Sequence, residues 1–266
     1  MPTRDSAWPQ GTPCWVDCSV DDPQAARDFY SRLLGWEILD SPPEAGGYLM
    51  AMLGGKPAAG IGPKMGAGPM PSVWTTYLAA DDADAVSDAV GAAGGTVFVP
   101  PMDVMDVGRM SVAADPTGAV FGIWQPEEHK GAGIYNEPGA YCWNELHTRD
   151  YATAQEFYRR VFGWNFDEIG DGQNFVYSTF RLPDGDVLGG LMDASQVLGE
   201  TPPYWLTWFQ VAGTDESVAL ATELGAKILM PVNDTPFGRS AVVQAPQGEV
   251  FALIDPTVRV GAAPGQ

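Results

Sequence analysis

The first hydrophobic segment of the chain predicts a strand followed by a helix. Residues 14–20, CWVDCSV, alternate so that successive side chains point to opposite faces, as they do in a strand. Asp22 is suited to cap a helix at its N-terminus, Pro23 fits the first turn, and Gly35 can end the helix. The chain therefore opens with the order strand, turn, helix.

The same order recurs later in this half and is followed by three more strands. Residues 73–80, VWTTYLAA, form a predicted strand, and residues 82–93 form an alanine-rich amphipathic helix that Gly94 stops. Further strands are predicted at TVFVP, RMSVAA and AVFGIWQ. The turn DPTG at 115–118 joins the last two of these strands as a hairpin.

The second half of the chain repeats the first. Residues 11–38 align with residues 139–166 at a shift of 128, and ten of the 28 aligned positions are identical. The repeat continues at a shift of 131 with three further pairs, which are Trp74 and Trp205, Gly94 and Gly225, and Pro100 and Pro231. A repeat this long indicates a duplicated domain and not a solenoid.

The repeated blocks predict an α+β fold made of four βαβββ units, two in each half. The N-terminal domain is expected to span residues 9–127 and the C-terminal domain residues 139–258. Residues 128–138, which contain Gly, Pro and Glu, are expected to form the linker between them.

Composition and charge narrow the function classes. With 266 residues, 45% of them hydrophobic, the chain can bury a substantial core. Its net charge of −20 repels polyphosphate, so neither nucleic acid nor an anionic membrane is expected as a partner. No segment has the roughly 20 apolar residues of a membrane-spanning helix, and no leader pattern opens the chain, so we expect a cytoplasmic protein.

The three cysteines are expected to be reduced structural thiols, because their number is odd and a chain of this size does not depend on disulfides. Cys14 and Cys18 share the strand face opposite to Trp15 and should pack against a helix. A nucleophilic role would need a basic neighbour, and the sequence offers none nearby.

The motifs of both halves resemble the vicinal oxygen chelate superfamily, which includes glyoxalase I, extradiol dioxygenases and bleomycin-resistance proteins. The resemblance is carried by FYxxxxGW after the first strand, by VGR at 107–109 and FGR at 237–239, and by DPTG before a final strand. It covers nearly the whole chain and implies two tandem domains of the glyoxalase type. The Cys-Trp pair on the first strand of both halves is similar to a tandem actinobacterial group often labelled hydroxylase or antigen. Some members of that group occur among anthracycline biosynthesis genes as accessory proteins, which implies a partner enzyme of a biosynthetic pathway.

The resemblance also implies where a metal ion would bind. Metal enzymes of this superfamily hold one divalent ion with His, Gln or Glu on the first and last strands of their units. In this chain the residues at those positions offer no imidazole or carboxylate. They are Trp15, Thr75 and Gly122 in the first half and Trp143, Leu206 and Ala252 in the second. We therefore expect neither a metal nor another cofactor.

Strand alternation predicts which side chains line the two clefts of the fold. On the first strand of the first half, Trp15 shares a face with Asp17 and Ser19. On the first strand of the second half, Trp143 shares a face with Glu145 and His147. Tyr77 and Trp208 are expected to face inward from the next inner strand. Trp74 and Trp205 then point outward beneath a helix, where their role would be structural.

Glu145 and His147 are the candidates for acid or base chemistry, because a carboxylate two residues away can tune an imidazole. Glu145 and Asp17 could instead accept hydrogen bonds from a ligand's hydroxyl or ammonium group. His129 lies in the linker and is expected to be solvated. Arg109 and Arg239, each after a glycine, could close over a ligand or form surface ion pairs.

Two functions remain open. The first is a metal-independent protein that binds a planar aromatic small molecule, of antibiotic or polyketide type, between tryptophan and tyrosine rings for biosynthesis support, sequestration or resistance. The negative charge favours a cationic ligand through an attraction that weakens with salt. The second is a lyase, hydroxylase or dioxygenase that uses Glu145 and His147 or a metal. The second cleft is preferred as the site, because its residues are the more polar and aromatic set.

Overall fold

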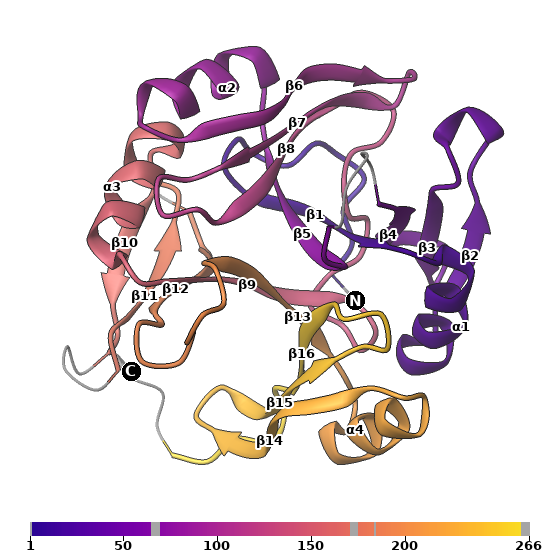
Figure 1. Ribbon diagram of the computed structural model, residues 1–266. Helices are drawn as coiled ribbons and strands as arrows, with labels where there is room; N and C mark the ends of the chain where they lie inside the picture. Colours follow the sequence, from indigo (N-terminus) through magenta and orange to yellow (C-terminus); the bar gives the residue numbers. More distant parts are fainter. Residues whose placement is uncertain (1, 65–69, 171–174, 184, 262–266) are drawn as a thin grey trace.

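The computed structural model describes residues 2–64, 70–170, 175–183 and 185–261. Within these ranges each half of the chain forms one sheet of eight strands, and four helices accompany the two sheets (Figure 1). The helices are α1 (Pro23–Leu34), α2 (Ala83–Ala92), α3 (Tyr151–Phe162) and α4 (Thr214–Glu223). The α+β prediction with four βαβββ units is confirmed.

The first sheet has the order β2-β3-β4-β1-β5-β8-β7-β6. Its strands are β1 (Pro13–Val20), β2 (Glu37–Asp40), β3 (Leu49–Leu53), β4 (Lys56–Pro63), β5 (Val73–Ala79), β6 (Thr96–Val104), β7 (Gly108–Ala114) and β8 (Val120–Pro126). The second sheet repeats this order as β10-β11-β12-β9-β13-β16-β15-β14. Its strands are β9 (Tyr141–Thr148), β10 (Asn165–Glu168), β11 (Tyr177–Arg181), β12 (Val187–Asp193), β13 (Tyr204–Gln210), β14 (Lys227–Thr235), β15 (Gly238–Gln244) and β16 (Val250–Asp255).

In each sheet the first strands of the two units pair antiparallel at the centre. In the first half β1 pairs with β5, and each of these strands also pairs in parallel with the last strand of its own unit, β4 or β8. The second half uses β9, β13, β12 and β16 in the same way. Because residues directly opposite on paired strands share a face, this register decides which side chains meet at the middle of the sheet.

Local signals set the helix ends where the sequence predicted them. The Asp22 carboxylate accepts from the backbone N–H groups of Gln24 and Ala25, and Gly35 ends α1 in the left-handed conformation with φ 73°. Asp150 and Gly163 do the same for α3. The Asp115 carboxylate shapes the predicted hairpin turn by accepting from backbone N–H groups within that turn.

The two halves share a core, so that helices from one half pack against elements of the other. Helix α1 of the first half contacts α4 of the second, and α2 contacts α3, which lies next to it in Figure 1. Two tyrosines make matching bonds across the halves, from Tyr30 Oη to Glu249 Oε1 and from Tyr158 Oη to Asp115 Oδ2, each at 3.1 Å. These helix contacts and hydrogen bonds therefore join the two halves through a shared core.

Candidate functional site

The predicted inward residues of the first half form one hydrogen-bonded group. In register across β1 and β5, Trp15 lies opposite Tyr77. The Tyr77 hydroxyl donates to Asp17 Oδ2 at 3.0 Å, and the Trp15 indole N–H donates to the Tyr48 hydroxyl at 3.0 Å. The other carboxylate oxygen, Asp17 Oδ1, is buried without a partner. Burial raises the pKa of Asp17 from its ordinary value to about 7.

His129 of the linker packs against the rings of this group, which corrects the expectation that His129 is solvated. The His129 ring contacts the Trp15 ring edge-on at 4.4 Å and the Trp124 ring at 5.5 Å. The Trp124 indole N–H donates to the His129 carbonyl at 2.9 Å, and His129 Nε2 is buried without a partner. Burial lowers the pKa of this imidazole to about 4. We call Trp15, Asp17, Tyr48, Tyr77, Trp124 and His129 the N-terminal cluster.

The rest of the linker is also packed against the first half. The backbone N–H of Ala132 donates to the Cys14 carbonyl at 2.8 Å, and that of Gly133 donates to the Pro57 carbonyl at 2.8 Å. Trp8, near the N-terminus, contacts the Tyr135 ring at 5.0 Å and donates to the Ala132 carbonyl. This segment therefore acts as part of the first half and covers its cluster.

The second half carries the matching group of side chains. Trp143 lies opposite Trp208 across β9 and β13. The Trp143 indole N–H donates to the Tyr177 hydroxyl at 3.1 Å, and this hydroxyl donates to Glu145 Oε2 at 2.7 Å. His147 Nε2 lies 2.5 Å from the other oxygen, Glu145 Oε1. Burial and the nearby Glu145 carboxylate raise the pKa of Tyr177.

Tyr204 completes the second group, since it lies opposite His147 and its ring contacts the imidazole at 5.1 Å. We call these residues the C-terminal cluster: Trp143, Glu145, His147, Tyr177, Tyr204 and Trp208. All of the sequence-predicted residues of this half are therefore brought together.

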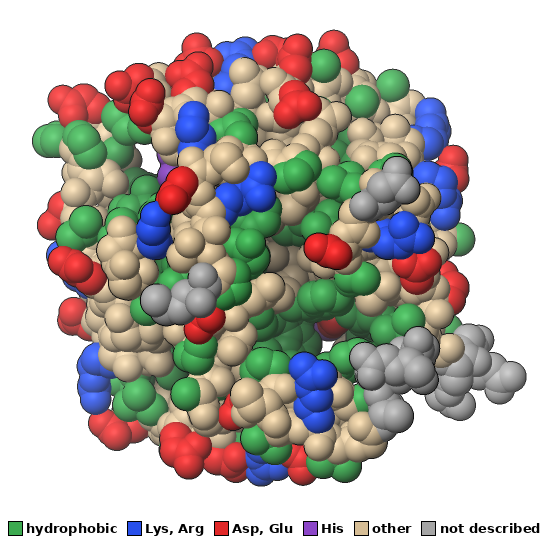
Figure 2. Space-filling model, turned by 180° about the vertical axis from the view of Figure 1, so that it is seen from behind, with side chains coloured by type: hydrophobic (Ala, Val, Ile, Leu, Met, Phe, Trp, Pro, Cys, Tyr) green, Lys and Arg blue, Asp and Glu red, His purple; other side chains and the backbone are tan. Residues whose placement is uncertain are grey.

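The two clusters differ in their exposure to solvent. Trp15 and Tyr77 are 3% and 7% exposed, because His129 and the linker cover them. Trp143, His147 and Trp208 are only half-buried. The face seen in Figure 2 is hollowed near its middle, and hydrophobic side chains line the hollow. Among the described residues, the facing rings Trp143 and Trp208 are therefore less buried than their counterparts Trp15 and Tyr77.

Tyr48 and Tyr177, which connect the tryptophan to the carboxylate in each cluster, were not predicted from the sequence. The two tyrosines are 129 positions apart, a spacing between the shifts of 128 and 131 found in the surrounding repeat. That spacing is the sequence signal that could have identified them as equivalent. Each tyrosine lies against a glycine: a Cβ at Gly60 would lie 1.7 Å from the Tyr48 hydroxyl, and one at Gly190 would lie 1.8 Å from that of Tyr177. Any larger residue there would displace the tyrosine.

Aromatic rings and small residues occupy the strand positions where metal enzymes of similar fold would carry their ligands. Tyr77, and not Thr75, lies at the level of Trp15, and its ring lies over Gly122 so closely that a Cβ there would be 2.1 Å from Tyr77 Cδ1. In the second half Trp208 lies between Trp143 and Ala252. Among the described residues, no three His, Cys, Asp or Glu side chains gather closely enough to hold a metal ion.

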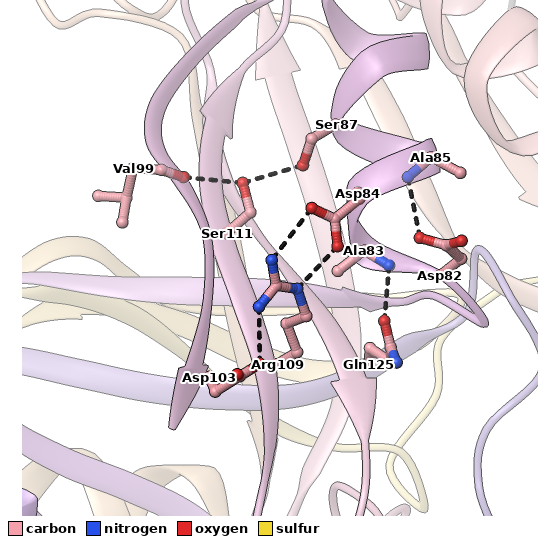
Figure 3. A network of polar contacts seen from close by, with 10 residues as sticks. All are labelled: Asp82, Ala83, Asp84, Ala85, Ser87, Val99, Asp103, Arg109, Ser111 and Gln125. Carbon is pink, nitrogen blue, oxygen red and sulfur yellow. Dashed lines mark hydrogen bonds and ion pairs between the residues drawn. The ribbon is translucent and has the colours of Figure 1, made fainter. Parts of the chain in front are cut away.

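Arg109 forms ion pairs, which was one of the two alternatives left open for it (Figure 3). Its guanidinium binds both oxygens of Asp84, at 2.7 and 3.0 Å, and binds Asp103 at 2.6 Å. Arg239 makes the same arrangement with Asp215 and Asp234. Both groups tie the start of a helix to an edge hairpin and do not reach the clusters.

Trp74, Trp205, Cys14 and Cys18 are buried, as the strand alternation predicted. Trp74 and Trp205 lie beneath helices, and their indole N–H groups donate to the Tyr30 and Tyr158 hydroxyls, each at 3.1 Å. Cys14 and Cys18 are buried and free, and burial raises the pKa of both thiols.

One further surface feature, a pocket, lies apart from the clusters. A pocket of about 510 Å³ lies where the end of α1 meets the start of α4, and its lining includes Arg32, Gly139 and Glu216 but no residue of either cluster. In the part of the chain that the structure describes, no helix is long and apolar enough to span a membrane.

The variant Asp17→Asn is expected to stabilise the protein at pH 8 and to leave it unchanged at pH 4. The folded-state pKa of Asp17 lies above its unfolded value, so the stability contributed by the protonated carboxyl is present below about pH 4 and is lost as the pH rises to about 7. We expect a gain of about 2 kcal/mol in the free energy of unfolding at pH 8, less than the full linkage energy because the amide is also buried.

Urea unfolding of the native protein and the variant at half-unit steps from pH 4 to pH 8 measures the difference in their free energies of unfolding. His129 titrates in both proteins, so its contribution cancels in that difference. The exposed Asp28→Asn variant is the control for loss of one negative charge. A gain of equal size at every pH would contradict a pKa of Asp17 that is raised in the folded state.

Comparisons with known proteins agree with this fold. The family model described as "Glyoxalase/Bleomycin resistance protein/Dioxygenase superfamily" matches residues 15–123 and 137–253. A relative from Mycobacterium tuberculosis (strain CDC 1551 / Oshkosh), named "Putative glyoxylase CFP32", is 41% identical, over 96% of this chain and 98% of its own. The "Anthracycline biosynthesis protein DauV" of Streptomyces sp. (strain C5) is 36% identical, over 92% of this chain and 93% of its own.

Solved structures with the same fold are more distant in sequence. The Mn(II)-bound glyoxalase from Novosphingobium aromaticivorans superposes with a TM-score of 0.62 at 17% identity, and the match covers 95% of this chain and 87% of that one. At that identity the likeness concerns the arrangement of the strands and helices alone.

Proposed function

The chain belongs to the Glyoxalase/Bleomycin resistance protein/Dioxygenase superfamily, and on that premise we propose that it is a metal-independent binding protein for a planar aromatic small molecule. The C-terminal cluster is the proposed site. Trp143, Tyr204 and Trp208 supply the rings, while Glu145 and His147 supply polar groups.

The observation that carries this proposal is the replacement of metal-ligand positions by aromatic rings. Imidazole and carboxylate are the groups that hold a divalent ion in this kind of site. Here Trp143 and Trp208 lie side by side on β9 and β13, next to Ala252 on β16. Indole rings cannot ligate a cation but present flat apolar surfaces, so this donor set fits a planar ligand and does not fit a metal ion.

Stacking and burial supply the binding energy in this proposal. An aromatic pair contributes about 0.5–1.5 kcal/mol beyond the burial of its area. Trp143, Tyr204 and Trp208 are all half-buried, so part of each side chain is already ordered by the sheet while part is accessible. Preordered rings lose little conformational entropy when a ligand binds, which favours affinity.

The names of two relatives support the same class of ligand. Proteins named for anthracycline biosynthesis from two Streptomyces are 36% and 35% identical to this chain over 92% of its length. We extend that context to this protein as part of the proposal. Its ligand would be an aromatic polyketide or a related antibiotic, held for a partner enzyme, for sequestration or for resistance.

Polycyclic aromatic compounds, above all those carrying an amino group, are expected to quench the tryptophan fluorescence and to raise the melting temperature. A ligand that binds only the folded state stabilises it by about 2.7 kcal/mol at a hundredfold excess over its dissociation constant. Fluorescence titration and thermal unfolding with a panel of such compounds measure both effects. If no member of the panel causes either effect, the binding function is wrong.

The protein as purified is expected to carry no stoichiometric metal, and a chelator should leave its melting temperature unchanged. The reason is the chemistry of the aligned positions, where no side chain in either half is a ligand for a divalent ion. Elemental analysis of the purified protein, together with unfolding in the presence of EDTA, checks this expectation. One equivalent of zinc, nickel, manganese or iron bound at Glu145 and His147 would contradict it.

One contact favours an enzyme as the second candidate. His147 Nε2 lies 2.5 Å from Glu145 Oε1, and their side chains are 12% and 9% exposed. A carboxylate that orients an imidazole in this way can assist proton transfer to or from a bound molecule. Mass spectrometry of a bound compound in deuterated water distinguishes the candidates, because exchange that the His147→Gln variant abolishes would favour the enzyme.

A further inference from the structure

We infer that the ligand presents a hydrogen-bond acceptor on its ring edge, such as a ring carbonyl, to the indole N–H of Trp208. This inference rests on the proposed function and identifies the polar feature that the site recognises. It assigns Trp208 a role in specificity in addition to the stacking that any aromatic side chain could supply.

The first observation is an unused donor. Trp208 Nε1 is buried and has no hydrogen-bond partner, although the Trp208 ring as a whole is only half-buried. An indole nitrogen can only donate, and a buried donor without a partner is costly. Trp143 differs, since its N–H already donates to the Tyr177 hydroxyl. Of the two facing tryptophans, only Trp208 therefore has an indole N–H that is not already engaged by a described residue.

The second observation is that the carboxylate of the cluster is already engaged. Glu145 Oε2 accepts from the Tyr177 hydroxyl, and Glu145 Oε1 contacts His147 Nε2. An ammonium group on the ligand would have to compete with both partners inside a buried site. Attraction of a cation by this protein therefore comes from its overall charge of −20, an effect that salt weakens.

A second polar atom of the cluster, His147 Nδ1, fits the same ligand. When His147 Nε2 carries the proton that faces Glu145, Nδ1 is an acceptor, and no described residue donates to it. Such a site accommodates a ring carbonyl at Trp208 and a hydroxyl group at His147. The matching ligands are planar hydroxylated ketones or quinones, whose polar groups lie in the ring plane.

The test compares two neutral tricyclic probes that differ only at one ring position, xanthone with a carbonyl and xanthene with a methylene. Dissociation constants are measured by calorimetry for the native protein and for two variants, Trp208→Phe and Trp143→Phe. The native protein should bind xanthone about five- to tenfold more tightly than xanthene, as expected for one neutral hydrogen bond. Trp208→Phe should abolish that ratio, whereas Trp143→Phe should weaken both probes alike.

The outcomes separate this inference from the function on which it rests. If the native protein binds both probes equally, or if Trp208→Phe preserves the ratio, the assignment to Trp208 is wrong while the binding function stands. If neither probe binds and the wider panel also gives no signal, the proposed function itself fails. The ratio in the native protein needs no variant, so equal binding of the two probes would overturn the assignment even if Trp208→Phe does not fold.

A third probe tests the role of charge. The cation 9-aminoacridine should lose affinity as the salt concentration rises, while the affinity for xanthone should stay nearly constant. Trp208→Phe should leave the affinity for 9-aminoacridine unchanged within about twofold, because a probe without a carbonyl loses no hydrogen bond. A loss for this cation as large as the loss for xanthone would show that Trp208 acts only through its ring, which would overturn the inference.

Discussion

Replacing Trp143 with alanine is expected to weaken binding of the aromatic ligand by about 2–3 kcal/mol, or roughly 30- to 150-fold, because an anchoring aromatic ring in an interface commonly carries that much. Trp143 is half-buried, faces Trp208 across the sheet and orders Tyr177 through its indole N–H. The variant loses both a stacking surface and that hydrogen bond. Fluorescence titration or calorimetry with a compound from the ligand panel measures the change.

The matched control is Trp15→Ala in the N-terminal cluster. Trp15 occupies the equivalent strand position but is covered by His129, and it is 3% exposed. Its loss should lower the free energy of unfolding without a comparable loss of affinity. Both variants must be titrated at a temperature where each remains folded. Equal losses of affinity would mean that the protein has two sites, or one site shared between the halves.

Replacing Trp164 with alanine is expected to lower the free energy of unfolding by about 3–5 kcal/mol, as for other large aromatic side chains removed from a core. Trp164 is fully buried and its ring stacks on Phe180 at 3.9 Å and on Tyr158 at 4.8 Å. Its indole N–H donates to the Gly11 carbonyl at 2.9 Å, so it also joins the second half to the start of the first.

Urea unfolding of Trp164→Ala and Trp164→Phe measures these contributions separately. The phenylalanine variant keeps the stacking partners but loses the bond to Gly11, and it should cost only about 1–2 kcal/mol. Trp36 is the equivalent residue of the first half, and its N–H donates to the Gly139 carbonyl. Trp36→Ala should therefore lower the free energy of unfolding by an amount comparable to that of Trp164→Ala. A loss below about 1 kcal/mol for both alanine variants would contradict a core shared by the two halves.

The sequence predicted much of the C-terminal cluster because its residues lie on a few strands. Trp143, Glu145 and His147 alternate along β9, and a period of two places them on one face wherever that strand is found. The inward direction of Trp208 followed from the same rule on β13. Tyr177 and Tyr204 escaped prediction, because they reach the cluster by strand pairing and by ring contacts between distant segments.

His129 shows the limit of local reasoning most clearly. Its neighbours in sequence are charged and are followed by glycine, which is typical of a solvated linker. The histidine is half-buried and its Nε2 is buried, because the linker backbone bonds to Cys14 and Pro57 and brings the ring against Trp15, more than a hundred residues away in the chain. No period or motif in residues 128–138 records that contact.

By itself the sequence determined the four βαβββ units, the duplicated halves, the helix caps and the strand faces that carry tryptophan and carboxylate. These features depend on interactions between residues a few positions apart, such as Asp22 with the first turn of α1. The tertiary structure alone decided that His129 of the linker packs on the N-terminal cluster, that Trp143 and Trp208 stay half-buried, and that the Trp208 indole N–H has no partner among the described residues. Those outcomes depend on which distant surfaces pack together, because burial and hydrogen bonding are properties of the assembled core.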